Sequence, residues 1–125
     1  MTDIVPGLRG EAARTVTDEL TAERLGSGSV PVFGTPALLA MIEDAAVAAV
    51  AGAVQPGSTT VGIWVELEHI APSRVGARVH ATAELKAVNG RTLEFECEAF
   101  EAGKLIGRAR HRRAVVEMER FLARI

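Results

Sequence analysis

Residues 35–57 read TPALLAMIEDAAVAAVAGAVQPG, and this stretch decides the fold. Thr35 is a good N-cap, and Pro36 suits the first helical position, where no backbone N–H is missed. Gln55-Pro56-Gly57 is a strong breaker, so we expect a helix over 36–54. Apolar side chains cover nearly its whole circumference. Such a helix must be surrounded by other elements and not merely docked on a surface.

The helix is unsuited to a membrane because Glu43 and Asp44 lie near its middle. One charge at the centre of a membrane helix costs about 2.5–3.5 kcal/mol on insertion scales, and here there are two. The N-terminus, MTDIVPGLRGE, lacks the basic start and apolar core of a secretion signal. Cys97 is the only cysteine, and a lone thiol suits a reducing compartment. We therefore expect a soluble, cytoplasmic protein without membrane contact.

The segments around the helix predict strands. Before it, residues 11–25 read as extended, and 26–34 (GSGSVPVFG) read as a loop. After it come four segments of alternating character, with the strong hairpin signal Asn89-Gly90 between the second and third. We expect strands at 59–70, 77–88, 91–100 and 104–118, and a short helical tail at 119–125.

Alternation predicts which strand residues face the core. The phase of the last strand shifts near Arg112-Arg113, which a β-bulge would explain. Cys97 falls on an inward face, where it is expected to be a small core residue and not a nucleophile. The residues expected to point inward are Val61, Ile63, Val65, Leu67 and His69, then Val79, Ala81, Ala83, Leu85 and Ala87, then Leu93, Phe95, Cys97 and Ala99.

The order of elements is strand, helix, then a meander of about four strands, with no βαβ repetition. An apolar helix requires a sheet that curls about it. We therefore predict a single α+β domain, 1–125, with the hot-dog arrangement of one long helix wrapped by about five antiparallel strands. So small a sheet leaves one edge and part of the helix uncovered, which a second copy would close. We expect a homodimer, with pairing of dimers into tetramers left open.

Composition excludes several function classes. Lys and Arg number 14 against 16 Asp and Glu, for a net charge of −2, so nucleic acid is not an expected partner. No Cys/His set has metal-ligand spacing, and we expect no metal. The segment GSGSVPVFG lacks the preceding strand and the lysine of a phosphate-binding loop, so no cofactor is expected.

Two side chains are the first candidates for chemistry. Glu43 lies among apolar helix neighbours, where an ionised carboxylate is costly unless it is paired or partly wet. His69 is in phase with the apolar face of its strand, at the strand's end, and a hydrogen-bonded core histidine is the alternative interpretation. His80 is out of phase and expected to be solvated. His111, in the basic last strand, is a weaker candidate.

The spacing of Thr35, Glu43 and His69 resembles that of a known family. Their contexts, GTPALLAMIEDA and VGIWVELEHIAPSRVGARVHATAELKAVNGR, and the tail HRRAVVEMERF are similar to the fluoroacetyl-CoA thioesterase-like branch of the hot-dog superfamily from about residue 7 onward. The resemblance implies an active site of Thr35, Glu43 and His69. It also implies that the backbone of Gly62 lies close to the bound acyl group.

The same resemblance implies hydrolysis of a small acyl-CoA. Glu43 would attack or activate water, His69 would move the proton, and Thr35 would hold the carboxylate or the substrate oxygen. The loop 26–34 departs from the aromatic gate of the fluoroacetate-specific enzyme, Phe33 being its one possible counterpart. A broader or different short acyl group is therefore expected. The alternatives are a hot-dog hydratase or dehydratase acting on acyl thioesters, and a non-catalytic acyl-CoA binding module.

Two questions about the substrate site stay open. The forked guanidinium groups of arginine suit the phosphates of coenzyme A. For the arginines of the last strand, a solvated strand face paired with Glu94, Glu96 and Glu98 is an equally good explanation. Eight residues of helix separate Thr35 from Glu43 by about 12 Å. Thr35 must therefore fold back, or the site must draw on both protomers. The candidate phosphate contacts are Arg74, Arg78, Arg108, Arg110 and Arg112.

Overall fold

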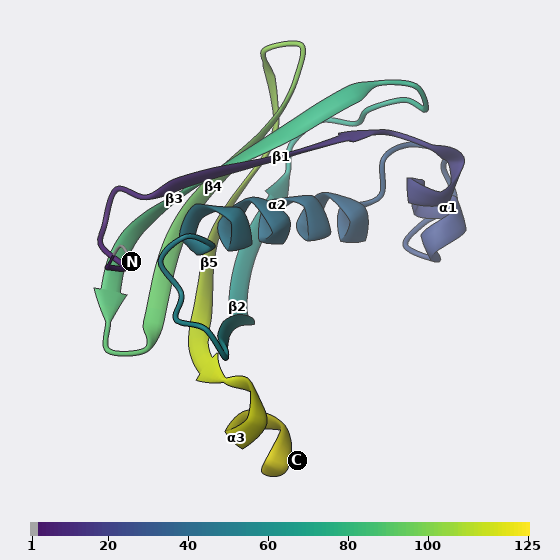
Figure 1. Ribbon diagram of the computed structural model, residues 1–125. Coiled ribbons are helices and arrows are strands. Elements are labelled where there is room, and N and C mark those ends of the chain that lie inside the picture. Colours follow the sequence, from purple (N-terminus) through teal and green to yellow (C-terminus); the bar gives the residue numbers. More distant parts are fainter. Residues whose placement is uncertain (1–2) are drawn as a thin grey trace.

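One long helix lies in the hollow of a curled antiparallel sheet (Figure 1). The computed structural model describes residues 3–125. The sheet has five strands in the order β1-β3-β4-β5-β2, so β1 and β2 form its edges. The elements are β1 (Arg9–Thr15), η1 (Asp18–Leu20), α1 (Ala22–Leu25), α2 (Thr35–Val50), β2 (Ser58–His69), β3 (Arg78–Asn89), β4 (Thr92–Glu101), β5 (Lys104–Glu117) and α3 (Met118–Ala123).

The four strands after the helix agree with the prediction to within one residue at each end. The predicted first strand is wrong beyond residue 15. There the chain turns into η1 and α1, because the Thr21 hydroxyl accepts the Arg24 N–H as an N-cap and Gly26 ends the turn with φ 71°. Helix α2 also stops at Val50, four residues earlier than predicted.

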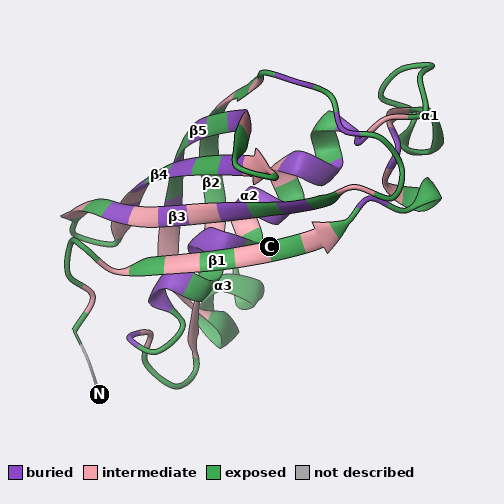
Figure 2. Cartoon of the chain, turned by 90° about the horizontal axis from the view of Figure 1, so that it is seen from above, coloured by how far each residue is buried: buried purple, intermediate pink, exposed green. Residues whose placement is uncertain are grey.

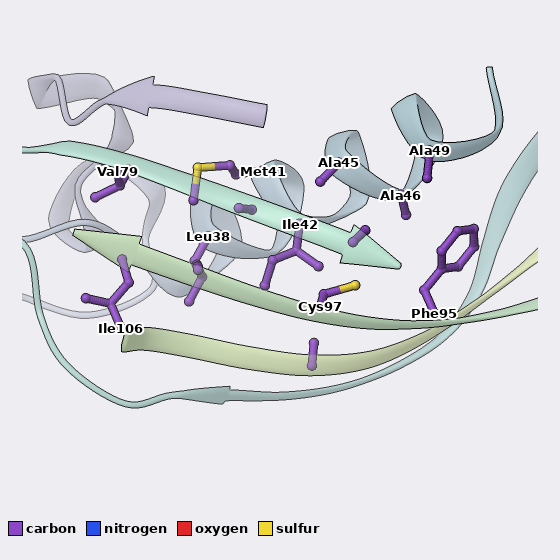
Figure 3. Close-up of a cluster of buried hydrophobic side chains, with 14 of the residues drawn as sticks. Leu38, Met41, Ile42, Ala45, Ala46, Ala49, Val79, Phe95, Cys97 and Ile106 are labelled. Atoms are coloured by element: carbon purple, nitrogen blue, oxygen red, sulfur yellow. The ribbon is translucent and has the colours of Figure 1, made fainter. Parts of the chain in front are cut away.

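The core lies between α2 and the concave face of the sheet (Figures 2 and 3). Strands β3 and β4 alternate between buried and exposed residues as predicted, apart from Ala87. Burial raises the pKa of the Cys97 thiol to about 12, so it is inert as a nucleophile. The helix contributes its buried residues Ala37, Leu38, Met41, Ile42, Ala45, Ala46, Ala49 and Val50.

One side of α2 stays open. Ala40, Asp44 and Val47 are exposed, and Glu43 is half-buried. One chain therefore leaves part of the helix uncovered, as the sequence predicts for so small a sheet. Within residues 3–125, no helix is long and apolar enough to cross a bilayer.

A β-bulge in β2 changes the predicted faces. Gly62 pairs with Arg113 and Trp64 with Arg112, so Ile63 is an extra residue. The register break does lie at Arg112-Arg113, but the additional residue is on the partner strand. Val61 consequently does not share a face with Val65, Leu67 and His69, and Ile63 is 53% exposed. Ala87 leaves its predicted face for the same reason, because the β3–β4 register shifts between Leu85 and Ala87.

Strand β1 crosses α2 at very close range, which requires Gly10. A Cβ on Gly10 would lie 2.3 Å from the Ala45 carbonyl oxygen and 2.3 Å from the Ala49 backbone nitrogen. Neither backbone atom can move aside without shifting the helix.

We predict that Gly10→Ala lowers the free energy of unfolding by at least about 1–3 kcal/mol, the usual penalty for overpacking. Gly52→Ala is the matched control, because a Cβ at Gly52 meets nothing within 4 Å. Denaturant unfolding of both variants measures the difference. Equal stability of the two would contradict this account of the crossing.

Candidate functional site

The first polar cluster joins the start of α2 to the end of β2. Helix α2 begins at Thr35, and its N-cap is Gly34, with no side-chain cap. The predicted capping role of Thr35 is therefore wrong. Its hydroxyl instead meets the imidazole of His69, with Oγ1 and Nδ1 2.8 Å apart. Both residues come from one chain, although 34 positions separate them.

His69 is half-buried on the concave side of β2. Burial lowers its pKa below the ordinary 6.5, so the ring is neutral at neutral pH. Its Nε2 is buried and has no hydrogen-bond partner among residues 3–125. Thr35 itself is exposed. A neutral imidazole within hydrogen-bond reach of an accessible hydroxyl is the arrangement that activates a nucleophile.

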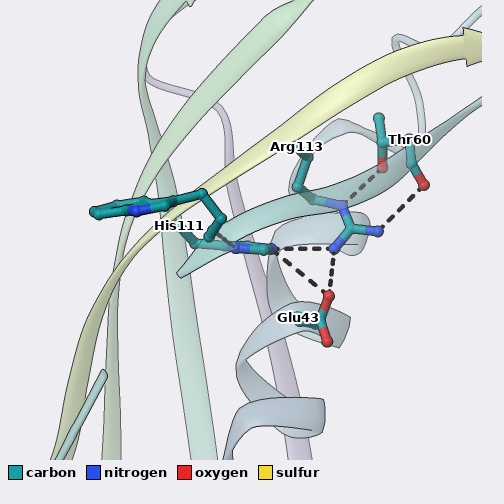
Figure 4. A network of polar contacts seen from close by, with 5 residues as sticks. Glu43, Thr60, His111 and Arg113 are labelled. Carbon is teal, nitrogen blue, oxygen red and sulfur yellow. Dashed lines mark hydrogen bonds and ion pairs between the residues drawn. The ribbon is translucent and has the colours of Figure 1, made fainter. Parts of the chain in front are cut away.

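The second cluster surrounds Glu43, about two turns further along α2 (Figure 4). Arg113 Nη1 donates to Glu43 Oε2 at 2.9 Å. The guanidinium is buried, and Thr60 holds it through its hydroxyl (2.9 Å from Nε) and its carbonyl (3.2 Å from Nη2). The Glu43 side chain is 39% exposed, so its carboxylate is paired on one side and accessible on the other.

His111 completes the second cluster. Its side chain is 2% exposed, with Nδ1 2.8 Å from the Trp64 carbonyl oxygen. Its Nε2 lies 3.1 Å from Arg113 Nη1 and 3.9 Å from Glu43 Oε2. Burial lowers the pKa of His111, and the positive charge of Arg113 lowers it further. The ring is therefore neutral, with Nδ1 as donor to Trp64 and Nε2 as acceptor from Arg113.

Gly62 makes room for the Glu43 carboxylate. A Cβ on Gly62 would lie 2.6 Å from Glu43 Oε2 and 3.3 Å from Arg113 Nη1. The concave face of β2 therefore needs glycine at this position.

The structure thus brings Thr35 and His69 together, whereas Glu43 contacts Arg113.

The residues predicted to contact the substrate lie in different environments. Phe33 is buried in the core, with 1% of its surface exposed. Arg74 and Arg78 are exposed, the backbone of Arg74 bridging to Val32 and the side chain of Arg78 bonding Thr15. The exposed arginines of β5 form surface ion pairs, Arg108 with Glu68, Arg110 with Glu66 and Arg112 with Glu94.

Sequence reasoning missed Arg113 and undervalued His111. Alternation along β5 contains the signal, because Ala109, His111 and Arg113 occupy one face and Arg108, Arg110 and Arg112 the other. Because two of these inward residues, His111 and Arg113, are polar, the regular alternation was interpreted as a change of phase. His80 is exposed and stacks on Phe100, as expected for a solvated histidine.

Comparison with known proteins decides the family. The family model described as fluoroacetyl-CoA-specific thioesterase matches residues 16–119. The chain belongs to this thioesterase family. It is 35% identical over 94 residues, 75% of this chain and 68% of the relative, to the fluoroacetyl-CoA thioesterase of Streptantibioticus cattleyicolor.

Solved structures confirm the hot-dog fold. The fluoroacetyl-CoA thioesterase FlK superposes with a TM-score of 0.90 at 29% identity, covering 98% of this chain and 96% of FlK. A thioesterase superfamily member from Thermus thermophilus gives a TM-score of 0.89 at 27% identity, covering 98% and 91% of the two chains. The predicted α+β hot-dog class is confirmed.

We predict that Gly62→Ala lowers thioesterase activity while the protein stays folded, because the new Cβ displaces the flexible Glu43 carboxylate and not the backbone. Activity on acyl-CoA and the melting temperature are measured side by side. Val61→Ala, on the opposite face of β2, is the control. Full activity in Gly62→Ala would show that the carboxylate need not occupy its observed position.

Proposed function

We propose that this chain hydrolyses a small acyl-CoA, using Thr35, His69 and Glu43. The contact between Thr35 Oγ1 and His69 Nδ1 carries the proposal, because it pairs an accessible hydroxyl with a neutral base. Family membership supports the thioester substrate. A variant of FlK, 30% identical to this chain, has been solved in complex with fluoroacetate and CoA.

In the first step, His69 Nδ1 takes the proton of Thr35, and Oγ1 attacks the thioester carbonyl carbon. The carbonyl oxygen becomes an oxyanion, which a free backbone N–H in the first turn of α2 would stabilise. When the C–S bond breaks, the sulfur of coenzyme A takes the proton from His69. The product of this step is an ester between the acyl group and Thr35. This extends the role expected from the sequence, in which Thr35 only held another group.

In the second step, water hydrolyses the acyl-Thr35 ester. The Glu43 carboxylate accepts one proton of the attacking water and passes it through His69 to the leaving Thr35 oxygen, so that Glu43 and His69 both return to their starting states. Arg113 holds one carboxylate oxygen of Glu43 at 2.9 Å and so fixes its orientation. The products are the carboxylic acid and the free hydroxyl of Thr35.

The distance between Thr35 and Glu43 argues that two chains build each site. The two residues belong to one continuous helix and lie about 12 Å apart along its axis. Strand β2 is an edge of the sheet, and it carries Gly62 beside Glu43 and His69 at its far end. If two β2 edges pair antiparallel about a two-fold axis, the His69 end of each strand approaches the Gly62 half of the other.

We therefore propose a homodimer through β2. Each site takes Thr35 and His69 from one protomer and Glu43 with Arg113 from its partner. The exposed apolar side chains of Ile63, Trp64 and Val65 lie along this edge and support the pairing. Whether dimers pair further into tetramers is independent of this proposal.

Other substrate contacts follow from exposure. Arg74 is exposed near the start of α2, where its backbone bridges to Val32, and we propose that it binds the phosphates of coenzyme A together with Arg78. Phe33 is buried, and its N–H donates to the Ser73 carbonyl at 2.8 Å. We therefore expect Phe33 to fix the backbone leading into Thr35 and not to gate the acyl group.

The free thiol of Cys97 is consistent with the cytoplasmic location expected from the sequence.

We predict release of free thiol from a short-chain acyl-CoA panel, measured with a disulfide dye. Thr35→Val should lower kcat by at least about 10²-fold, whereas Thr35→Ser keeps a hydroxyl and should retain activity. Glu43→Gln should accumulate acyl-Thr35, detected by mass spectrometry.

The pH dependence of kcat/KM tests the role of His69. Because the pKa of His69 is lowered, kcat/KM should stay flat above pH 6.5 and fall only below it, as the ring is protonated.

Other outcomes of the same panel would replace this function. Loss of the enoyl absorbance without thiol release would identify a hydratase, and tight binding without turnover would identify a binding module. Undiminished hydrolysis by Thr35→Val would remove the proposed nucleophile.

Subunit mixing tests the shared site. Thr35→Val and Glu43→Gln homodimers are each expected to be inactive. When they are mixed in equal amounts and exchange subunits, half of the dimers are mixed, and each mixed dimer has one complete site. About a quarter of wild-type activity should therefore return. No recovery, with exchange verified by native mass spectrometry, would place each site within one chain.

A further inference from the structure

We propose that His111 is a positioning residue that fixes Arg113 and, through it, the carboxylate of Glu43. The proposal rests on the function above, in which Glu43 acts on water, and adds the group that sets its orientation. His111 does not touch the substrate in this scheme. Its side chain contacts Arg113 from within the sheet (Figure 4) and is 2% exposed.

The hydrogen bonds of Arg113 leave its guanidinium only one orientation. Nε and Nη2 donate to the hydroxyl and carbonyl of Thr60, at 2.9 and 3.2 Å. Nη1 is shared between Glu43 Oε2, at 2.9 Å, and His111 Nε2, at 3.1 Å. Without the His111 acceptor, Nη1 loses the partner that fixes it from the side of the sheet, and Glu43 loses a fixed donor.

The tautomer of His111 is set by the β2 bulge. Its Nδ1 lies 2.8 Å from the carbonyl oxygen of Trp64, the residue that follows the extra Ile63. A carbonyl only accepts, so Nδ1 carries the hydrogen and the lone pair of Nε2 faces Arg113. The chain of contacts therefore runs from the Trp64 carbonyl through His111 and Arg113 to Glu43.

A purely structural role predicts something different. A buried histidine that only stabilises the sheet would lower the melting temperature when replaced, but the folded protein would turn over at the same rate. Asparagine and glutamine separate the two possibilities, because each reproduces one ring nitrogen. The Asn amide reaches the place of Nδ1, and the Gln amide reaches the place of Nε2.

The experiment compares His111→Asn with His111→Gln in steady-state hydrolysis of the best acyl-CoA of the panel. We expect His111→Asn to lower kcat about 10²-fold with little change in KM, the effect of a misplaced catalytic group. His111→Gln supplies an acceptor to Arg113 and should retain most of kcat, although both variants melt at lower temperature. The same two substitutions at the exposed His80 are the matched control and should change neither kcat nor KM.

Equal kcat values for folded His111→Asn and His111→Gln, whether both are lowered or both normal, would overturn the proposal. A second measurement keeps it testable if the wild-type protein hydrolyses no acyl-CoA, an outcome that removes the proposed function alone. His111→Asn and Glu43→Gln are combined in a double-mutant cycle of unfolding. Non-additive effects support the linkage through Arg113, and additive effects contradict it.

Discussion

The structure depends on a mismatch between one apolar helix and the sheet that must cover it. Five strands curl around α2 and bury the side that carries Leu38, Met41 and Ile42, but they do not close around it. The open side faces away from the buried core and carries Ala40, Asp44 and Val47, and the half-buried Glu43 lies at its border. The helix is therefore both the centre of the hydrophobic core and the support of a partly solvated carboxylate.

The arginine beneath that carboxylate imposes the second constraint. A buried guanidinium is tolerated only when its donors are satisfied and its charge is balanced. Thr60, His111 and Glu43 provide these partners, and Gly62 leaves the space they need. The bulge at Ile63 lets inward residues on both sides of it, Gly62 and Val65, contribute to the same concave face. A regular strand would turn one of these two residues outward.

The sequence predicted most of the fold because its signals are local. The helix breaker at Pro56, the Asn89-Gly90 turn and the alternation in β4 each depend on adjacent residues, and the four following strands agree to within one residue. The strand predicted over residues 16–25 was wrong, because Thr21 and Gly26 act as helix caps only once the chain reverses there. Arg113 was missed because alternation along β5 places it on the face of Ala109 and His111 but does not show that a charged side chain can be buried there. Its burial is decided by Thr60 and Glu43, which are distant in sequence.

The separation of the two polar clusters within one chain suggests a role for the unpaired edge of β2. An exposed edge with Ile63, Trp64 and Val65 is a liability in a free monomer, because its backbone groups can pair with any strand. In the proposed dimer, pairing with a second copy would satisfy those groups. On the proposed mechanism it also brings the Thr35–His69 pair of one chain to the Glu43 of the other. Each protomer then holds its own groups in place by its own contacts. Association adds only the proximity of the two clusters. Within one chain this proximity is impossible, because a continuous helix separates residues 35 and 43.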